Sequence, residues 1–169
     1  MLRLVPLPTS IPGKLYLHSM PGRYEPFERT VAEIRMRGIT EVICLVPLDE
    51  IEFKSPDYAR ALKNGDTSWR QVMFPIVDYG VPKEREAYRR LIVQIVDSLR
   101  AGTNVLAHCG AGIGRTGTLA ACVLAVLGVP VAEALETVHA AGSYPERPEQ
   151  LDLVDWVARS TASDSANSR

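Results

Sequence analysis

Short apolar segments alternate with longer amphipathic segments along this chain, and the alternation predicts an α/β fold. Four segments have the length and apolar content of strands: residues 14–18, 41–46, 71–77 and 104–107. After Glu41 the chain stays apolar up to Val46 and then meets Pro47, a pattern typical of a strand that is covered on both faces. Such strands lie in the middle of a parallel sheet.

Amphipathic segments between and after these strands predict the helices. The clearest spans residues 83–100, where apolar positions recur at intervals of three and four: Tyr88, Leu91, Ile92, Ile95, Val96 and Leu99. Shorter helices are predicted at residues 26–37, 58–63, 118–127, 130–140 and 148–160. The whole pattern predicts a central, mostly parallel sheet of four to five strands, flanked by helices on both faces. We interpret residues 1–160 as a single domain and the small polar residues 161–169 as a frayed tail.

Composition limits the classes of protein to which the chain can belong. The 169 residues are 46% apolar and 23% charged, and a net charge of −1 disfavours a nucleic-acid carrier or a polybasic membrane-surface protein. The three cysteines are an odd number without a CxxC pair, which argues against a disulfide scaffold and a structural zinc site. Prolines interrupt the N-terminal residues, and Gly128 and Pro130 interrupt the most apolar segment. We therefore expect a cytoplasmic protein with neither a signal peptide nor a membrane span.

A glycine-rich turn joins the strand at 104–107 to the next helix, and it gives the strongest functional signal in the chain. Its sequence, residues 108–117, is HCGAGIGRTG. Gly110, Gly112 and Gly114 allow backbone N–H groups to converge on one point, and the start of the helix adds the positive end of its dipole. The turn is therefore predicted to bind an anion the size of a phosphate.

Three chemistries of glycine-rich loops compete for this turn. A Walker loop would lack its lysine, because Gly117 is followed directly by Thr118. A dinucleotide-binding loop would match the glycine spacing but lacks the second strand and the acidic residue about 20 positions later. A nucleophilic cysteine gives a role to Cys109 and Arg115, which the other two loops leave without one. Five residues separate Cys109 from Arg115. The loop would place a thiolate beneath an anion that Arg115 holds with two hydrogen bonds.

The turn resembles the His-Cys-x5-Arg-Ser/Thr signature of the cysteine-based protein tyrosine and dual-specificity phosphatases. All of its residues except Gly110 match the form typical of the protein tyrosine phosphatases. Residues 13–22 and 74–82 are similar to the compact phosphatases related to the cyclin-dependent-kinase-associated phosphatase, and the resemblance covers residues 12–158. It implies a phosphotyrosine protein phosphatase-like fold and hydrolysis through a phosphocysteine intermediate.

In this family an aspartic acid upstream of the cysteine acts as general acid and base, and the resemblance places it at Asp78. Asp78 precedes Cys109 by 31 residues. The reaction needs such a group, because an alkoxide or phenoxide is a poor leaving group unless it is protonated. The alternative is that Asp78 caps the helix that begins near Lys83. If Asp78 is not the acid, Asp57 and Asp66 are the next candidates.

The resemblance also implies supporting roles for three residues. His108 would orient the loop and favour the thiolate, with a purely packed and hydrogen-bonded histidine as the alternative. Thr116 would donate its hydroxyl group to the sulfur and could also cap the helix. Gln150 would position the hydrolytic water, with an ordinary place in the first turn of a helix as the alternative.

Two cysteines lie outside this set. Some relatives have a cysteine at the position of Cys44 that forms a reversible disulfide with the nucleophile, and a buried free thiol is the alternative. Cys122 lies within an apolar helix and is expected in the core.

The predicted function is that of a protein phosphatase that acts on phosphotyrosine, and also on phosphoserine and phosphothreonine if the pocket is shallow. Cys109 is the nucleophile, Arg115 the phosphate clamp and Asp78 the general acid and base, with no metal and no cofactor. The residues expected around the phosphate are Gly110, Ala111, Gly112, Ile113, Gly114 and Arg115. A phosphorylated protein or peptide is the expected partner, and the sequence implies no oligomeric state.

Three alternatives to this function remain open. A non-catalytic binding module would recognise phosphorylated partners without turning them over. A phosphoinositide phosphatase often has lysines inside the loop, whereas Gly110, Ala111 and Ile113 are uncharged. An arsenate reductase shares the Cys-x5-Arg loop, but there the acid follows the loop, and here it precedes it.

Overall fold

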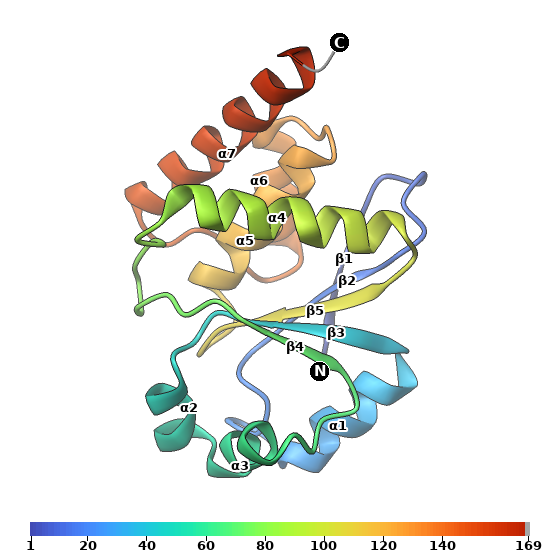
Figure 1. The fold of residues 1–169 in the computed structure, drawn as a ribbon, viewed down its shortest axis with the longest axis vertical. Coiled ribbons are helices and arrows are strands. Elements are labelled where there is room, and N and C mark those ends of the chain that lie inside the picture. Colours follow the sequence, from blue (N-terminus) through green and yellow to red (C-terminus); the bar gives the residue numbers. More distant parts are fainter. Residues whose placement is uncertain (168–169) are drawn as a thin grey trace.

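A five-stranded sheet forms the centre of the computed structural model, which describes residues 1–167 of the chain. The strands lie in the order β1-β2-β5-β3-β4 (Figure 1). They are β1 (Arg3–Val5), β2 (Leu15–His18), β3 (Ile39–Cys44), β4 (Arg70–Met73) and β5 (Asn104–His108). β1 pairs antiparallel with β2, and the other pairs are parallel. The predicted α/β fold is confirmed.

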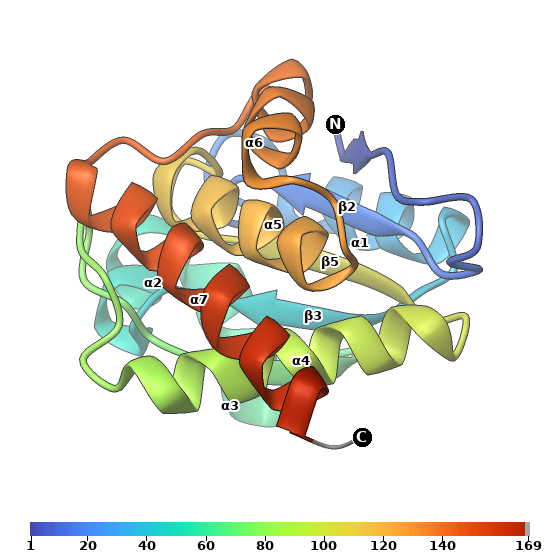
Figure 2. The same cartoon turned by 90° about the horizontal axis from the view of Figure 1, so that it is seen from above.

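Helices cover both faces of this sheet, as predicted. They are α1 (Phe27–Met36), α2 (Leu48–Lys54), α3 (Pro56–Asn64), α4 (Arg85–Arg100), α5 (Gly114–Val126), α6 (Val131–Ala140) and α7 (Pro148–Asn167). Figure 1 shows α1, α2 and α3 on one face and the other four on the opposite face. In Figure 2, α7 lies diagonally across α5 and α4. Within residues 1–167, no helix combines the length and the apolar content needed to cross a bilayer.

Helix α5 is apolar on all sides because it lies between the sheet and other helices. It packs against α4, α6 and α7 as well as β5. Every residue from Gly114 to Leu124 is buried. A helix that is hydrophobic all round has no solvent-facing stripe and belongs in a core. The N-terminus of α5, and with it the preceding loop, is therefore fixed relative to the sheet.

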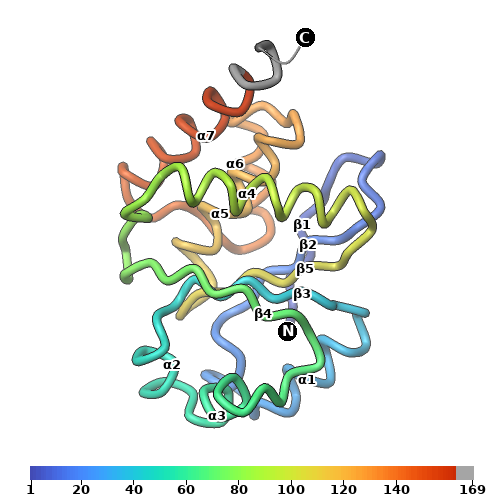
Figure 3. Tube along the Cα trace, viewed as in Figure 1, coloured from blue at the N-terminus to red at the C-terminus, as the bar shows by residue number. Residues whose placement is uncertain are grey.

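The strand register brings the chain segments that follow four strands to one edge of the sheet. His108 at the end of β5 pairs with His18 at the end of β2 and with Cys44 at the end of β3. Cys44 in turn pairs with Met73 at the end of β4. Because these strands are parallel, the loops that follow them meet at the same end, and this end also holds the start of α7 (Figure 3).

Several elements differ from the sequence-based expectations. β1 was not expected, the strand expected at 41–46 spans Ile39–Cys44, and the helix expected at 118–127 begins at Gly114. The strand expected at residues 71–77 ends at Met73, and beyond it only Phe74 and Ile76 donate to β3 and its extension, because Pro75 has no N–H group. The helix expected at residues 58–63 lies within α3, and a further helix, α2, precedes it. Helix α7 continues from the expected end at residue 160 to Asn167, and residues 168 and 169 of the expected tail lie outside the described residues. The single-domain organisation stays a prediction.

Candidate active site

The glycine-rich turn folds into a loop around the buried thiol of Cys109. Cys109 follows the last residue of β5 and is 2% exposed. The Gly112 N–H donates to Cys109 Sγ at 3.3 Å. Arg115, in the first turn of α5, is also buried. The sulfur and the guanidinium that were expected to act together are thus attached to one short loop between a central strand and a buried helix.

The loop can take this shape because Gly112 has no side chain. Its φ is +75°, and a Cβ atom there would lie 2.4 Å from the carbonyl oxygen of His18. Both the left-handed conformation and the close approach to the end of β2 therefore require glycine. The Met20 N–H donates to the Gly110 carbonyl at 3.2 Å, so the outer side of the loop is bonded to the segment that follows β2.

His108 is held as a neutral imidazole beneath the loop. Burial lowers its pKa to about 3. Its Nδ1 lies 3.4 Å from the Cys109 carbonyl oxygen, and its Nε2 lies 2.9 Å from the Tyr58 hydroxyl group. Because a carbonyl oxygen only accepts, the contact with Cys109 uses a proton on Nδ1, and the one proton of the Tyr58 hydroxyl group faces two acceptors, His108 Nε2 and Gln71 Oε1 at 3.3 Å. His108 thus contacts the backbone of the loop as an uncharged group, and its effect on the thiolate stays a prediction.

The guanidinium of Arg115 connects the loop to two carboxylates. It donates to Glu50 on α2 at 3.3 Å, to Asp78 at 2.8 Å and to the Ile76 carbonyl at 2.8 Å. Although burial lowers the pKa of Arg115, the negative charges of Cys109, Glu50 and Asp78 raise it above its ordinary value. These contacts fix the plane of the guanidinium, and its role in holding two phosphate oxygens stays a prediction.

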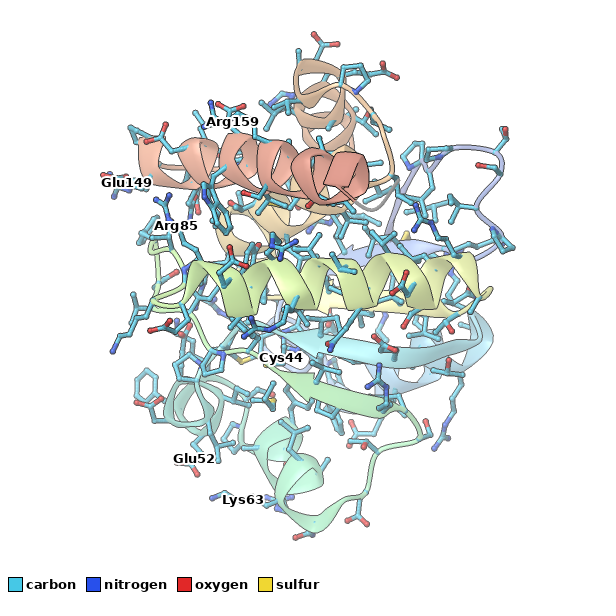
Figure 4. The ribbon with its side chains drawn as sticks, turned by 45° about the horizontal axis from the view of Figure 1, so that its top comes forward. Cys44, Glu52, Lys63, Arg85, Glu149 and Arg159 are labelled. Atoms are coloured by element: carbon cyan, nitrogen blue, oxygen red, sulfur yellow. The ribbon has the colours of Figure 1, made fainter. Side chains whose placement is uncertain are left out.

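Glu50 is a part of the site that sequence analysis did not find. Although burial raises its pKa, hydrogen bonds from Lys54 and Arg115 lower the pKa of Glu50 below its ordinary value. Its helix is tied to α3 by the ion pair of Glu52 with Lys63 (2.5 Å; Figure 4). No local pattern marks Glu50, because its role depends on a partner 65 residues away.

Asp78 lies in a tight turn between β4 and α4. The Gly80 N–H donates to the Val77 carbonyl at 2.9 Å, and Tyr79 has a φ of 57°. A left-handed φ at the third residue is the mark of a type II turn, and it is uncommon for a residue other than glycine. The Arg147 guanidinium lies 5.0 Å from the centre of the Tyr79 ring. The carboxyl group of Asp78 is 54% exposed and faces Arg115, so Asp78 does not cap α4, whose N-cap is Glu84.

Gln150 joins this turn to the start of α7. Its Nε2 donates to the Gly80 carbonyl at 3.1 Å, and its Oε1 accepts from the Glu146 N–H at 2.7 Å. The side chain is fully buried, although it lies in the first turn of an otherwise accessible helix end. Gln150 takes the place in the first turn of a helix that was the alternative interpretation, and its contacts tie the Asp78 turn to α7, whereas its role toward the hydrolytic water stays a prediction.

Replacing Gln150 by alanine should lower kcat of the reaction proposed below about tenfold while leaving oxyanion affinity unchanged. The Gly80 carbonyl loses its donor, so the Asp78 turn is held less firmly, whereas the loop around Cys109 keeps all its contacts. Steady-state kinetics and calorimetry with tungstate separate the two effects. Glu149→Ala, an exposed neighbour in the same turn (Figure 4), is the matched control. A loss of tungstate affinity as large as the loss in kcat would contradict the tether. A burst of product before the steady state would show that attack by water has become slow, and it would assign Gln150 to the hydrolytic water instead.

Thr116 and the remaining cysteines make no hydrogen bond to Cys109 in the residues that the structure describes, although Cys44 interacts with Tyr58. Among the described residues, the buried Thr116 Oγ1 has no hydrogen-bond partner, so the expected donation to Cys109 Sγ is not made here. Cys44 and Cys122 are buried free thiols. Burial raises the pKa of Cys44 to about 12. Cys44, labelled in Figure 4, ends β3 and pairs with His108 in the strand register, and its disulfide with Cys109 stays a prediction.

Comparison with known proteins agrees with this geometry. A family model described as "PTP-SAK: Swiss Army Knife protein, DSP-PTPase phosphatase domain" matches residues 11–167. Protein 067L of Invertebrate iridescent virus 3, whose name places it with the tyrosine phosphatases, is 34% identical over 108 residues. That match spans 62% of this chain and 41% of the viral protein, so the chain covers less than half of its relative's length.

Solved structures show the same fold at low sequence identity. The kinase-associated phosphatase KAP, with a serine in place of its catalytic cysteine, has a TM-score of 0.81 at 17% identity and covers 96% of both chains. PTPMT1 in complex with PI(5)P has a TM-score of 0.71 at 20% identity, covering 89% of this chain and 94% of that one. Because the family model matches nearly the whole described chain, this protein belongs to the DSP-PTPase phosphatase domain family.

Proposed function

We propose that this protein hydrolyses phosphate monoesters of proteins, phosphotyrosine above all, through a covalent intermediate on Cys109. The observation that supports it most is the placement of Arg115, which donates to Asp78 at 2.8 Å and belongs to the same loop as the buried Cys109. A nucleophile, an anion clamp and a proton donor are thereby within reach of one phosphate group.

The first step transfers the phosphoryl group to sulfur. The Cys109 thiolate attacks phosphorus, an S–P bond forms, and the P–O bond to the leaving group breaks. Asp78 gives its proton to the leaving oxygen, so an alcohol or phenol departs. The loop N–H groups and Arg115 hold the three remaining phosphate oxygens, whose negative charge they neutralise throughout.

The second step returns the enzyme to its initial state. Asp78, now a carboxylate, takes a proton from a water molecule as the water oxygen attacks phosphorus. The S–P bond breaks, inorganic phosphate leaves, and Cys109 is again a thiolate. Each proton that Asp78 gives in the first step is recovered in the second, so the cycle needs neither a metal nor a redox partner.

The position of the acid supports a shallow substrate site. Asp78 and Tyr79 are 54% and 53% exposed, so the proton donor stands at the surface of the protein rather than at the bottom of a deep slot. A long phosphotyrosine reaches a shallow loop easily, and the shorter side chains of phosphoserine and phosphothreonine reach it as well. We therefore include all three as substrates, with phosphotyrosine first.

A phosphoinositide is the second candidate substrate, favoured by Arg23. A Cβ atom on Gly110 would lie 3.0 Å from Arg23 Nη1 and 3.1 Å from Arg115 Nη2, with Glu50 Oε1 at 2.8 Å, so two guanidinium groups and one carboxylate meet at the same point of the loop. Arg23 stacks on the Tyr24 ring at 4.7 Å, and no ion pair involves it within the described part of the chain. Such a cation could meet a second phosphate, and PTPMT1 of the same fold was solved with PI(5)P.

A substrate panel in the presence of EDTA tests the proposed function. We expect release of phosphate from an aryl phosphate and from phosphotyrosine peptides, slower release from phosphoserine and phosphothreonine peptides, and inhibition by vanadate. Faster release from phosphoinositide vesicles would favour the second candidate. Loss of activity with the chelator would point to a metal-dependent mechanism, and tight binding without turnover would identify a binding module.

A further inference from the structure

The peptide group between Gly112 and Ile113 has to be held in one orientation for the loop to bind an oxyanion. In a trans peptide the C=O and the following N–H point in opposite directions. When the Gly112 carbonyl faces outward, the Ile113 N–H faces into the loop, where a phosphate oxygen would be. Gly112, with a φ of +75°, gives this peptide more rotational freedom than any other residue would.

Two side chains from distant parts of the chain donate to the outward-facing Gly112 carbonyl. Arg3 Nη2 lies 2.6 Å from this oxygen, and Ser143 Oγ lies 2.6 Å from it. Arg3 belongs to β1, and the fully buried Ser143 follows α6. A carbonyl oxygen has two lone pairs, so these two donors satisfy it completely. If the Gly112 carbonyl rotated away from these donors, it would lose both hydrogen bonds.

Arg3 is itself held in place on the side opposite the loop. Its Nη1 donates to the carbonyls of Ala141 and Gly142 at the end of α6. A cation at this position also interacts favourably with the C-terminal end of the helix dipole. β1 brings Arg3 here because it pairs with Leu17, next to the end of β2 against which Gly112 packs. The Arg3 guanidinium therefore connects the end of α6 with the Gly112 carbonyl of the loop. Capping of α6 explains only the first of these contacts.

We propose that Arg3 and Ser143 are positioning residues that hold the Gly112–Ile113 peptide with its N–H directed at the bound oxyanion. The inference rests on the proposed function, because it assigns the loop to oxyanion binding. Arg3 touches no substrate, and it acts through the loop backbone. Its partial burial lowers its pKa, while the negative charge of Cys109 raises it, which agrees with a cation placed behind the loop.

The test compares Arg3→Ala and Ser143→Ala with the wild-type protein, because each removes a donor to the same carbonyl from a different element. We expect each variant to bind tungstate several-fold to about tenfold more weakly in calorimetry, with a similar loss in kcat/KM. In NMR, the Ile113 amide should exchange its hydrogen faster in both variants. The tungstate and amide measurements need no turnover, so they remain informative if the wild-type protein proves not to be a phosphatase.

Arg70→Ala is the matched control for lost stability. Arg70 is the corresponding arginine of the opposite edge strand, β4, and its Nη2 bonds to the buried Glu41 at 2.6 Å. Its removal should lower the melting temperature without weakening tungstate binding. If Arg3→Ala also changes only the melting temperature, and both tungstate affinity and Ile113 exchange stay within twofold of wild type, the proposal is overturned and Arg3 only caps α6. Should Arg3→Ala not fold, Ser143→Ala gives the same decision.

Discussion

Replacing Cys109 by serine should abolish turnover, with a loss of at least about 10⁴-fold in kcat, while the protein stays folded and still binds tungstate. The sulfur lies at the floor of the loop and accepts the Gly112 N–H. A serine hydroxyl group in this place fits the same space, but it does not ionise near neutral pH and its oxygen is a poorer nucleophile and leaving group. The anion contacts come from the backbone and Arg115, so binding is retained.

The measurement combines steady-state hydrolysis of an aryl phosphate with calorimetry of tungstate binding. Cys44→Ser, assayed under reducing conditions, is the matched control because Cys44 lies next to His108 in the sheet register and is equally buried. Its thiol donates to the Val46 carbonyl and also interacts with the Tyr58 hydroxyl group, and a serine hydroxyl group can make the same bonds. Activity of the Cys109 variant within tenfold of wild type would show that another group attacks phosphorus.

Local signals in the sequence identified the parts of the site that lie on one segment. The apolar strand before Cys109 and the apolar helix after Gly114 predicted where the loop begins and ends, and the structure has the same junction. Asp78 was singled out through its spacing from Cys109 within a resemblance, and the structure places it on Arg115 of the same loop, while its role as the acid stays a proposal. Asp78 and Cys109 follow β4 and β5, and both strands run parallel to β3. The segments after them therefore meet at one edge of the sheet.

The residues that surround the loop were not predictable in this way. Glu50 lies on a helix of seven residues, Tyr58 on a helix of nine, and Arg3 on a strand of three. Elements this short have little periodic signal, and tertiary packing decides whether they form. The contact of Arg3 with Gly112 joins residues 109 positions apart, and it depends on the antiparallel pairing of an edge strand. Sequence patterns predict the elements, whereas such contacts follow only from their register.

The contact between Asp78 and Arg115 leads to an expectation about anion binding that goes beyond the loss of a proton donor. In the structure Arg115 Nη2 donates to Asp78 Oδ1 at 2.8 Å, and the same nitrogen donates to Glu50 Oε1 at 3.5 Å. A phosphate oxygen needs that N–H group, so the substrate must displace Asp78 from it. Displacement also frees the carboxyl group from the guanidinium, so that it can face the leaving oxygen.

Asp78→Asn should therefore lower kcat by about 10²- to 10³-fold and at the same time strengthen tungstate binding several-fold. The asparagine keeps the shape of the turn but neither donates a proton to an alkoxide nor competes for Arg115 with a negative charge. The loss should be larger for a phenyl phosphate than for a nitrophenyl phosphate, whose leaving group needs less protonation.

Asp57→Asn is the matched control for this substitution. Asp57 is an exposed carboxylate of α3 that bonds to Arg60 at 3.0 Å, so its neutralisation should change neither kcat nor tungstate affinity. The pH profile of kcat/KM for both variants, with tungstate titrations at one pH, separates the two effects of Asp78. An Asp78 variant with wild-type activity across the profile would place the acid elsewhere. Weaker tungstate binding would show that the Asp78 contact supports the guanidinium of Arg115 instead of competing with the anion for it.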